Sequence, residues 1–314
     1  MEPVTLSEVT ELTPKQTAAV HSLTAAARAA DRAAPLSGQF LLDLRPGSGA
    51  LHHLAYAGDG LAGYAQLSPA DGQAPVPPPP PAAELVVAPA QRRRGTGSAL
   101  LAALPPEVRV WAHGDVPGAA DFARATGLHV VRELLRMARS LGPRSPDLDE
   151  VVVPDPLTVR PFEPGRDEHA WLAANAAAFA HHPEQASLTL GDLEQRMGEP
   201  WFDPKGFILV VPRGQPDVVA AFHWTKVHPA GDEGPEPVGE VYVVGVDPAY
   251  QGSGLGRPLT LLGLRHLQEH GVEEVFLYSD SDNAAALRTY DRLGFTTVAT
   301  DRMYSHAVHP GVRP

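Results

Sequence analysis

The chain of 314 residues is long enough for two domains of ordinary size, each with its own core. Its 37 acidic residues outnumber its 25 basic residues, and the formal net charge of -12 argues against a nucleic-acid partner, because phosphate contacts need clustered Lys and Arg. Cysteine is absent, which excludes disulfides, thiolate metal sites and a cysteine nucleophile.

The first half of the chain predicts alternating helices and strands. In chain order they are a helix over 14–32, strands over 51–56 and 61–67, an apolar strand from 84, a helix cut short by Pro105-Pro106, a strand over 108–112, a short helix, and a final strand led by Gly127. The proline-rich stretch 73–83 is expected to be an extended surface loop, because proline donates no hydrogen bond to a sheet.

The second half repeats this plan after a proline-rich stretch. Residues 141–150, followed by Pro154 and Pro156, form the expected linker between the domains. In chain order the second half predicts a helix over 167–179, strands over 207–211 and 218–225, a loop over 228–238, an apolar strand from 240, a helix over 256–270, a strand over 274–278, a short helix, and a final strand led by Gly294.

The start of the chain, MEPVTLSEVTELTPKQ, is acidic and polar and lacks the basic and apolar regions of a secretory signal. No apolar run approaches the roughly 20 residues that span a bilayer. We therefore expect a cytoplasmic protein with no membrane partner. We also expect a monomer.

A strand followed by a glycine-rich loop and a helix occurs twice, as ELVVAPAQRRRGTGSAL at 84–100 and EVYVVGVDPAYQGSGLGR at 240–257. Aligning the two loops makes Arg92 the counterpart of Gln251. Backbone N–H groups at a helix start carry partial positive charge, and glycines allow a pyrophosphate to approach closely. The duplication therefore predicts two sites for a phosphorylated ligand.

These loops resemble the acetyl-CoA loop of the GNAT N-acetyltransferases, and the stretch DNAAALRTYDRLGF at 282–295 is similar to the GNAT ending N-x-x-A…Y-x-x-x-G-F. The resemblance implies an α/β fold of two tandem GNAT domains, each a mixed twisted sheet flanked by helices. Residues 1–145 would form a degenerate, non-catalytic domain and residues 155–314 a catalytic one. It implies acetyl-CoA as the co-substrate.

A narrower resemblance rests on the tandem layout together with HHPEQ at 181–185, FHWTKVH at 222–228 and EVYVVGVDP at 240–248. In these features the chain is similar to the mycothiol synthase family. The resemblance implies that acetyl-CoA acetylates the cysteinyl amine of cysteinyl-glucosaminyl-inositol, a small pseudo-disaccharide thiol, to give mycothiol. It implies that the second domain alone performs this chemistry.

Two residues are candidates for proton transfer. Glu240 begins the second apolar strand, and period-2 alternation puts it on a face with Tyr242 and Val244. The resemblance implies that Glu240 is the general base and that Tyr290 is the general acid for the departing thiolate. Because an α-amine has a pKa of roughly 7.7–8.0, a modest base is sufficient. Judged alone, Glu240 is an ordinary strand-edge acid and Tyr290 a packing residue.

Further candidates bind the cofactor and the acceptor. The expected cofactor ligands of the second domain are Val244, Gly245, Val246, Gln251, Gly252, Ser253, Gly254, Leu255, Gly256, Arg257, Asn283, Ala284, Ala285, Ala286, Leu287 and Arg288. Those of the first domain are Leu85, Val86, Val87, Arg92, Arg93, Arg94, Gly95, Thr96, Gly97 and Ser98. For the acceptor, the resemblance implies Glu184, Lys226, Glu240 and Tyr278.

The two copies differ outside the loop. Counting back equally far from Gln251 and from Arg92 reaches Glu240 in the second copy but Pro81 in the first. Aligning the glycines of the final strands places Ala123 opposite Tyr290, so the first copy lacks both the base and the acid. Two roles stay open for it: binding acetyl-CoA without turnover, or packing against the second copy.

The remaining alternatives concern metals and other functions. Among the fourteen histidines, which include the pairs His52-His53 and His181-His182, we expect no H-x-x-x-H or H-E-x-x-H arrangement on a helix, and therefore no metal. The rival functions are a tandem GNAT enzyme that acetylates another small amine and a non-catalytic acyl-CoA-binding regulatory module.

Overall fold

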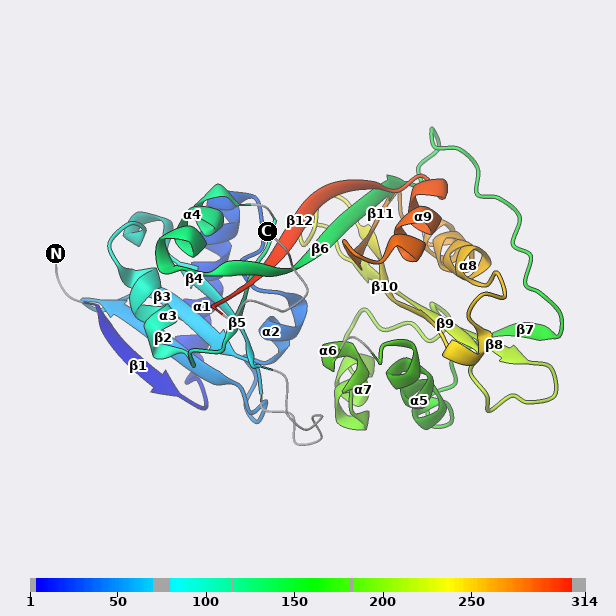
Figure 1. The fold of residues 1–314 in the computed structure, drawn as a ribbon, viewed down its shortest axis with the longest axis horizontal. Coiled ribbons are helices and arrows are strands. Elements are labelled where there is room, and N and C mark those ends of the chain that lie inside the picture. Colours follow the sequence, from blue (N-terminus) through cyan, green and yellow to red (C-terminus); the bar gives the residue numbers. More distant parts are fainter. Residues whose placement is uncertain (1–3, 70–79, 115, 181–182, 307–314) are drawn as a thin grey trace. The chain divides into compact units, whose positions relative to one another are not determined.

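The computed structural model describes residues 4–69, 80–114, 116–180 and 183–306. The chain divides into two compact units (Figure 1). Unit 1 comprises Met1–Leu135 and Ala299–Pro314, and unit 2 comprises Arg136–Val298. In the part of the chain that the structure describes, no helix is long and apolar enough to cross a membrane.

Unit 1 contains a sheet in the order β1-β2-β3-β4-β5-β12-β6. Its elements are β1 (Thr5–Val9), α1 (Pro14–Asp31), α2 (Gly38–Leu42), β2 (Leu51–Ala57), β3 (Gly60–Leu67), β4 (Ala82–Val87), η1 (Pro89–Gln91), α3 (Thr96–Ala103), β5 (Arg109–Ala112), α4 (Pro117–Thr126), the first part of β6 (His129–Ser140) and the last part of β12 (Thr296–Ser305). The predicted helix over 14–32 is confirmed: a capping box of Thr13 and Gln16 starts α1.

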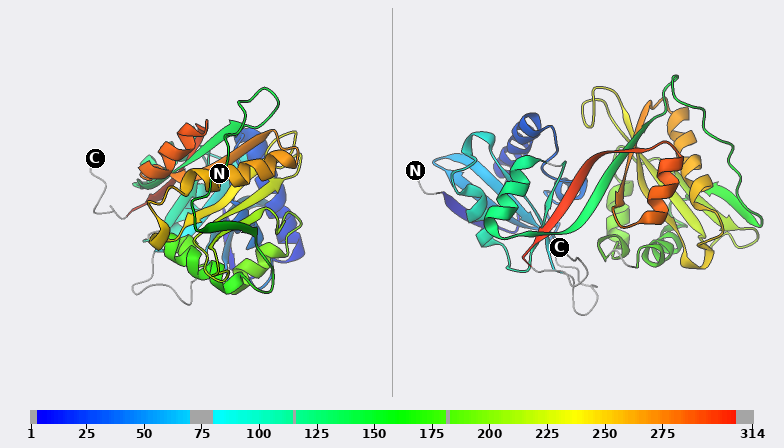
Figure 2. Two further views of the ribbon diagram at one scale, coloured as in Figure 1. Left: turned by 90° about the vertical axis from the view of Figure 1, so that its right-hand side faces the viewer. Right: turned by 45° about the horizontal axis from the view of Figure 1, so that its top comes forward.

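Unit 2 contains a sheet in the order β6-β11-β10-β9-β8-β7. Its elements are the last part of β6, β7 (Leu157–Pro161), α5 (Glu168–Ala178), α6 (Pro183–Ala186), α7 (Leu190–Met197), β8 (Phe207–Pro212), β9 (Ala221–His228), β10 (Val238–Val246), η2 (Pro248–Tyr250), α8 (Gly256–Glu269), β11 (Glu274–Asp280), α9 (Ala284–Arg292) and the first part of β12. Helices α5 and α8 cover opposite faces of this sheet (Figure 2).

The core of unit 2 on the α5 side is built from aromatic rings. Trp171 of α5 meets Phe207, Phe222 and Trp224 edge-on, with ring centroids 5.2, 5.6 and 5.7 Å apart. Edge-to-face contacts of this kind stabilise a core beyond the area that they bury. They fix β8 and β9 against α5, and β9 in turn supports β10.

The division between the units runs through two strands. The last part of β12 pairs with β5 in unit 1, with Arg302 opposite Ala112 and Tyr304 opposite Val110. The expected linker over 141–150 lies inside unit 2 rather than between the units. We call this placement of the end of β12 in the sheet of unit 1 the exchange of β12. A sequence repeat cannot reveal it, because the final strand of each copy has the same pattern whichever sheet it joins.

The proline-rich stretch is shorter than expected. Most of 73–83 lies outside the described residues, but Ala82 and Ala83 belong to β4 and are buried. The backbone carbonyl of Pro81 accepts a hydrogen bond from the N–H of Arg109 at 2.9 Å. A proline can occupy this strand entrance because only its carbonyl is needed there.

In each unit, two neighbouring parallel strands form β-sheet pairs only near their N-terminal ends. Residues 239–241 of β10 pair with 275–277 of β11, and 82–84 of β4 pair with 109–111 of β5. Beyond these positions β10 and β4 continue to pair only with β9 and β3 among the described residues. Each unit therefore has a splay between parallel strands that opens toward its glycine-rich loop.

A bulge in β10 changes the face on which its residues lie. Val241 pairs with Thr225 while Val243 pairs with the adjacent Trp224, so Tyr242 is the extra residue. The expectation that Val244 shares a face with Glu240 is therefore wrong. Val244 packs with α8, whereas Tyr242 lies on the α5 side with Trp224.

Candidate active site

Unit 2 has a cavity of about 590 Å³ at its splay. The lining residues come from α5, the end of β10, the loop before α8, α8 itself and α9. The predicted cofactor residues that line it are Val244, Gly245, Val246, Gln251, Gly252, Gly254, Leu255, Gly256, Asn283, Ala285 and Ala286. The end of β10, the glycine-rich loop and the N-terminus of α8 therefore line the same cavity.

The other predicted cofactor residues of this unit do not line the cavity. They are Ser253, Arg257, Ala284, Leu287 and Arg288. The guanidinium of Arg257 instead forms an ion pair with Asp149. The Ser253 hydroxyl donates to the carbonyl of Tyr250 at 2.5 Å, so it stabilises the loop from within.

The glycine-rich loop, which we also call the phosphate loop, has the same backbone conformation in both units. Gly252 and Gly254 have φ values of +79° and +81°, and their counterparts in the first loop, Arg93 and Gly95, have +59° and +87°. The left-handed region favours glycine, and Arg93 is an uncommon occupant of it. The loops therefore retain one geometry although one glycine position is occupied by an arginine.

Strand alternation orients backbone donors toward the splay. The N–H of Asp247 donates to Ala220 on the β9 side, so the N–H groups of Val246 and Val244 lie on the opposite edge. These donors, the loop and the N-terminus of α8 fit a thioester carbonyl and a pyrophosphate. The geometry therefore fits acetyl-CoA as the ligand of this cavity.

Glu240 is 9% exposed and lies in the middle of the sheet. Lys226 of β9 and Phe276 of β11 are its direct neighbours on either side. The Nε2 atom of His228 donates to Oε2 of Glu240 at 2.7 Å, and the second carboxylate oxygen has no hydrogen-bond partner among the described residues. One oxygen is held, and the other is available to a substrate or water.

Three of the four predicted acceptor residues lie on one face of the sheet. Lys226 and Glu240 are paired across β9 and β10, and Tyr278 lies two residues after Phe276 on β11. Tyr278 is 40% exposed. The Lys226 ammonium lies over the rings of Trp201 and Tyr242, at 4.9 and 5.4 Å.

Glu184 is the fourth predicted acceptor residue and falls in the short helix α6. The contacts of its side chain lie outside what the structure describes, as does the pair His181-His182. Its role stays a prediction.

Tyr290 lines the cavity from α9. Asn283 caps this helix, since its side-chain oxygen accepts from the N–H of Ala286 at 3.1 Å. Burial raises the pKa of Tyr290 to about 12, so its phenol keeps its proton at neutral pH. The side chain can therefore donate a proton into the cavity.

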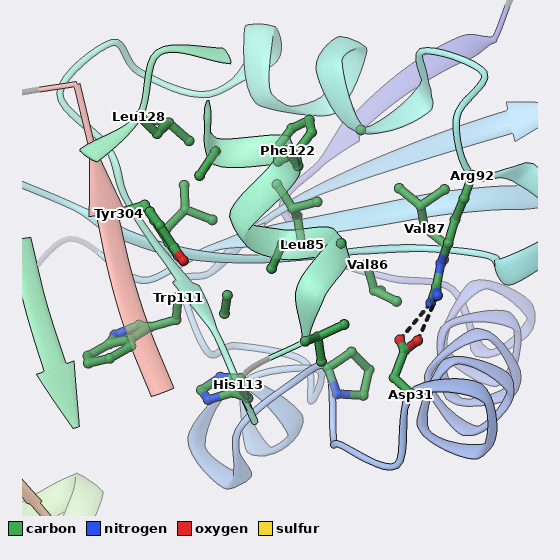
Figure 3. A pocket seen from close by; sticks show the side chains of 18 of the residues that line it. Asp31, Leu85, Val86, Val87, Arg92, Trp111, His113, Phe122, Leu128 and Tyr304 are labelled. Carbon is green, nitrogen blue, oxygen red and sulfur yellow. Dashed lines mark hydrogen bonds and ion pairs between the residues drawn. The ribbon is translucent and has the colours of Figure 1, made fainter. Parts of the chain in front are cut away.

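Unit 1 has a second cavity of about 460 Å³ at its own splay (Figure 3). The predicted cofactor residues that line it are Leu85, Val86, Val87, Arg92, Arg93, Gly95, Gly97 and Ser98. Arg94 and Thr96 do not: Arg94 donates to Gln91 at 3.3 Å and Thr96 is buried.

The arginines of this loop have different roles. Arg92 makes two hydrogen bonds to Asp31, at 2.7 and 2.6 Å (Figure 3). Its Nε also donates to the carbonyl of Val87 at 3.2 Å. Gln251 makes the equivalent bond to Val246, also at 3.2 Å. Arg92 is thus engaged in structure, and Arg93 makes no ion pair within the described residues, so its charge is available to a ligand.

Backbone hydrogen bonds agree with the prediction that unit 1 lacks the counterparts of Glu240 and Tyr290. Leu128 N–H donates to Ala123 at 2.9 Å, and Phe295 N–H donates to Tyr290 at 3.0 Å, so Ala123 has the place of Tyr290. Allowing for the bulge in β10, the counterpart of Glu240 shifts from Pro81 to Ala82. Neither residue carries a carboxylate.

A charged triad in unit 1, a partly buried histidine between two buried carboxylates, has no counterpart in the sequence predictions. His113 Nε2 lies 2.9 Å from Glu84 and its Nδ1 lies 2.7 Å from Asp301. Burial favours the neutral ring, but the two carboxylates outweigh it and raise the pKa of His113 to about 10. The second oxygen of Glu84 accepts from the N–H of Ser37 at 2.7 Å, so this carboxylate has no oxygen available as a base.

The sequence reasoning also misses three residues. The expectation that no histidines have the H-x-x-x-H spacing on a helix is wrong. His266 and His270 lie four residues apart at the end of α8, which is the H-x-x-x-H spacing, and their ring nitrogens approach Asp203. His228 is likewise missed, although it ends the strand that pairs with Glu240. The strand register, which the sequence does not give, is what brings His228 to that carboxylate.

Comparisons with known proteins agree with this arrangement. A profile described as the acetyltransferase (GNAT) family matches residues 168–295. A protein from Thermobispora bispora named mycothiol acetyltransferase is 50% identical over 298 residues, which cover 93% of this chain and 96% of that protein. One from Streptomyces coelicolor with the same name is 48% identical over 305 residues, covering 96% and 95%.

Solved structures share the fold. A tandem GNAT protein from the clavulanic acid biosynthesis pathway is similar with a TM-score of 0.71 at 20% identity, covering 98% of this chain and 100% of that one. A GCN5-related N-acetyltransferase from Sphaerobacter thermophilus is similar with a TM-score of 0.65 at 23% identity, covering 95% and 94%.

Proposed function

The chain belongs to the mycothiol acetyltransferase family of GNAT proteins, and on that basis we propose that unit 2 transfers the acetyl group of acetyl-CoA to the cysteinyl amine of cysteinyl-glucosaminyl-inositol, giving mycothiol. One observation supports placing the chemistry in unit 2. Its cofactor strand carries Glu240 and its cavity is lined by Tyr290, whereas unit 1 has Ala82 and Ala123 at these positions.

Bound acetyl-CoA supplies an activated thioester, and the protein supplies the proton transfers and the orientation. Glu240, held by His228, accepts the proton of the ammonium or of the attacking amine, directly or through a water. The N–H groups of Val244 and Val246 stabilise the negative charge that develops on the thioester oxygen. As the C–N bond forms and the C–S bond breaks, Tyr290 gives its proton to the departing thiolate.

The acceptor is held on the face that carries Lys226, Glu240 and Tyr278. An ammonium, a carboxylate and a phenol can together bind the many hydroxyls of a sugar–inositol substrate. Because Lys226 already rests on Trp201 and Tyr242, its position is fixed before the acceptor binds. Glu184 is the further residue that we propose for this site.

Unit 1 is proposed to bind acetyl-CoA without turning it over. The splay, the left-handed loop and the charge of Arg93 support binding. Unit 1 has no carboxylate at the position of Glu240 and no phenol at the position of Tyr290, which supports the proposal that it does not catalyse acetyl transfer.

The decisive experiment incubates the purified protein with acetyl-CoA and cysteinyl-glucosaminyl-inositol and identifies the product by mass spectrometry. N-acetylation leaves the thiol free, so a thiol titration separates it from S-acetylation. Glucosaminyl-inositol, which lacks the cysteinyl amine, is the control acceptor and should not react. Acetylation of a different amine in a panel, or acetyl-CoA binding with no turnover, would favour the rival functions instead.

A further inference from the structure

We propose that Asp203, His266 and His270 form a divalent-metal site in unit 2, and that zinc is the metal that suits it. Their ligand atoms all lie within 4.8 Å of one another. His266 Nε2 lies 3.2 Å from Oδ2 of Asp203, and His270 Nε2 lies 3.8 Å from the same oxygen. One carboxylate oxygen thus faces a ring nitrogen of each histidine.

The convergence follows from local structure. His266 and His270 lie four residues apart at the C-terminus of α8, so their side chains are on one face of the helix, with ring centroids 4.2 Å apart. Asp203 lies in a turn before β8, where its Oδ1 accepts from the N–H of Lys205 at 2.9 Å. That bond fixes the carboxylate and leaves Oδ2 facing both rings.

A hydrogen bond orients the ring of His270 for binding a metal through Nε2. His270 Nδ1 lies 2.7 Å from the carbonyl oxygen of His266, and because a carbonyl only accepts, Nδ1 must carry the hydrogen. In the neutral ring the lone pair is then on Nε2, the atom that faces Asp203.

The donor set and the spacing suit zinc. Two imidazoles and one carboxylate are common zinc ligands, with a water completing the tetrahedron. Bonds of roughly 2.0–2.1 Å in a tetrahedron put neighbouring ligand atoms roughly 3.3–3.4 Å apart. The 3.2 Å between His266 Nε2 and Asp203 Oδ2 is close to this spacing, and the 3.8 Å from His270 Nε2 exceeds it. The site is at the opposite end of α8 from the phosphate loop, about 20 Å away along a helix of 14 residues. We therefore assign it a structural role, independent of acetyl transfer.

The test uses untagged, chelator-treated full-length protein, because an affinity tag would itself bind metal. Zn²⁺ is titrated by calorimetry, and Co²⁺ by its visible absorption, into the unaltered protein and into His270→Ala and Asp203→Asn. His169→Ala is the matched control, since His169 is a histidine on another helix of the same unit. Circular dichroism establishes that each variant is folded.

We expect one Zn²⁺ per chain, a Co²⁺ spectrum of low coordination number, and weakening by roughly 10- to 100-fold or more in both ligand variants but not in the control. Zn²⁺ should raise the melting temperature of the unaltered protein and of the control alone. Absence of stoichiometric binding, or equal affinity in His270→Ala and His169→Ala, would overturn the site. Neither result bears on the acetyltransferase assay.

Discussion

The imidazole of His228 donates to the carboxylate of Glu240 across 2.7 Å, from the last residue of one strand to the start of its neighbour. The bond orients the carboxylate while leaving its second oxygen available. This arrangement makes His228 a positioning residue for the proposed base, and it leads to the first expected result.

Glu240→Gln should lower kcat/KM by roughly 10²-fold or more, because the amide cannot accept the amine proton. The rise of the rate with pH that depends on this base should also disappear. His228→Ala, which leaves the carboxylate in place, should cause a smaller loss. The exposed Glu236→Gln is the control. An unchanged pH–rate profile in Glu240→Gln would exclude Glu240 as the base.

Tyr290→Phe should lower kcat by roughly 10²-fold, with little change in the KM for acetyl-CoA, because the ring is kept and only the proton donor is lost. Since burial raises the pKa of Tyr290 to about 12, ionisation of this phenol should cause no loss of activity near neutral pH in the unaltered protein. Steady-state kinetics provide the measurement. Tyr250→Phe, which alters another phenol in the cavity wall, is the control; equal losses in both variants would argue against a specific acid.

Combining Arg93→Ala with Gly95→Ala should reduce acetyl-CoA binding from two sites per chain to one while leaving kcat close to that of the unaltered protein. Alanine is strained at the φ of +87° that Gly95 adopts. Equilibrium dialysis gives the stoichiometry. Gly254→Ala, the equivalent change in unit 2, should instead raise the KM for acetyl-CoA. Complete loss of activity in the folded double variant would contradict a chemically silent unit 1.

The Glu84–His113–Asp301 triad should make stability fall as the pH rises from about 6.5 to about 10. Over that window the folded protein holds a proton on His113 that the unfolded chain has released, since the pKa is about 10 in the fold and 6.5 without it. The stabilisation is therefore fully present below pH 6.5. Urea unfolding across this range should give a steeper decline for the unaltered protein than for His113→Gln. Parallel curves would show that the triad does not titrate as described.

Gly263→Ala should destabilise unit 2 by about 1–3 kcal/mol, because the added methyl would lie 2.0 Å from the ring of His223. Thermal unfolding measures the effect. Gly191→Ala in α7 is the control, since its methyl meets nothing closer than 3.8 Å. Adding His223→Ala should restore part of the stability that Gly263→Ala removes. If the two changes were simply additive, the proposed clash would be wrong.

Much of the fold follows from local patterns in the chain. Aligning Arg92 with Gln251 predicts that the two copies have the same loop structure. In the structure both side chains donate a hydrogen bond to a carbonyl of the preceding strand. The alignment of Ala123 with Tyr290 rests on matching glycines, and the helix-end hydrogen bonds agree with it. Glycine positions and apolar strands are local signals, so a single sequence carries them.

What the sequence could not supply depends on pairing between distant strands. The bulge at Tyr242 turns Val244 toward α8, and no period-2 count detects an extra residue. The register that joins His228 to Glu240 is equally non-local. The spacing of His266 and His270, by contrast, was visible, but their third partner, Asp203, comes from a turn before β8, far earlier in the chain.

The exchange of β12 has a consequence for how the protein is made. Asp301, which holds His113, and Tyr304, which lines the unit 1 cavity, are both on the last described strand of the chain. A fragment of residues 1–145 would lack them, and the edge of β5 would be left unpaired. During synthesis, the sheet of unit 1 can therefore be completed only after β12 has been made, although most of unit 1 precedes unit 2 in the chain.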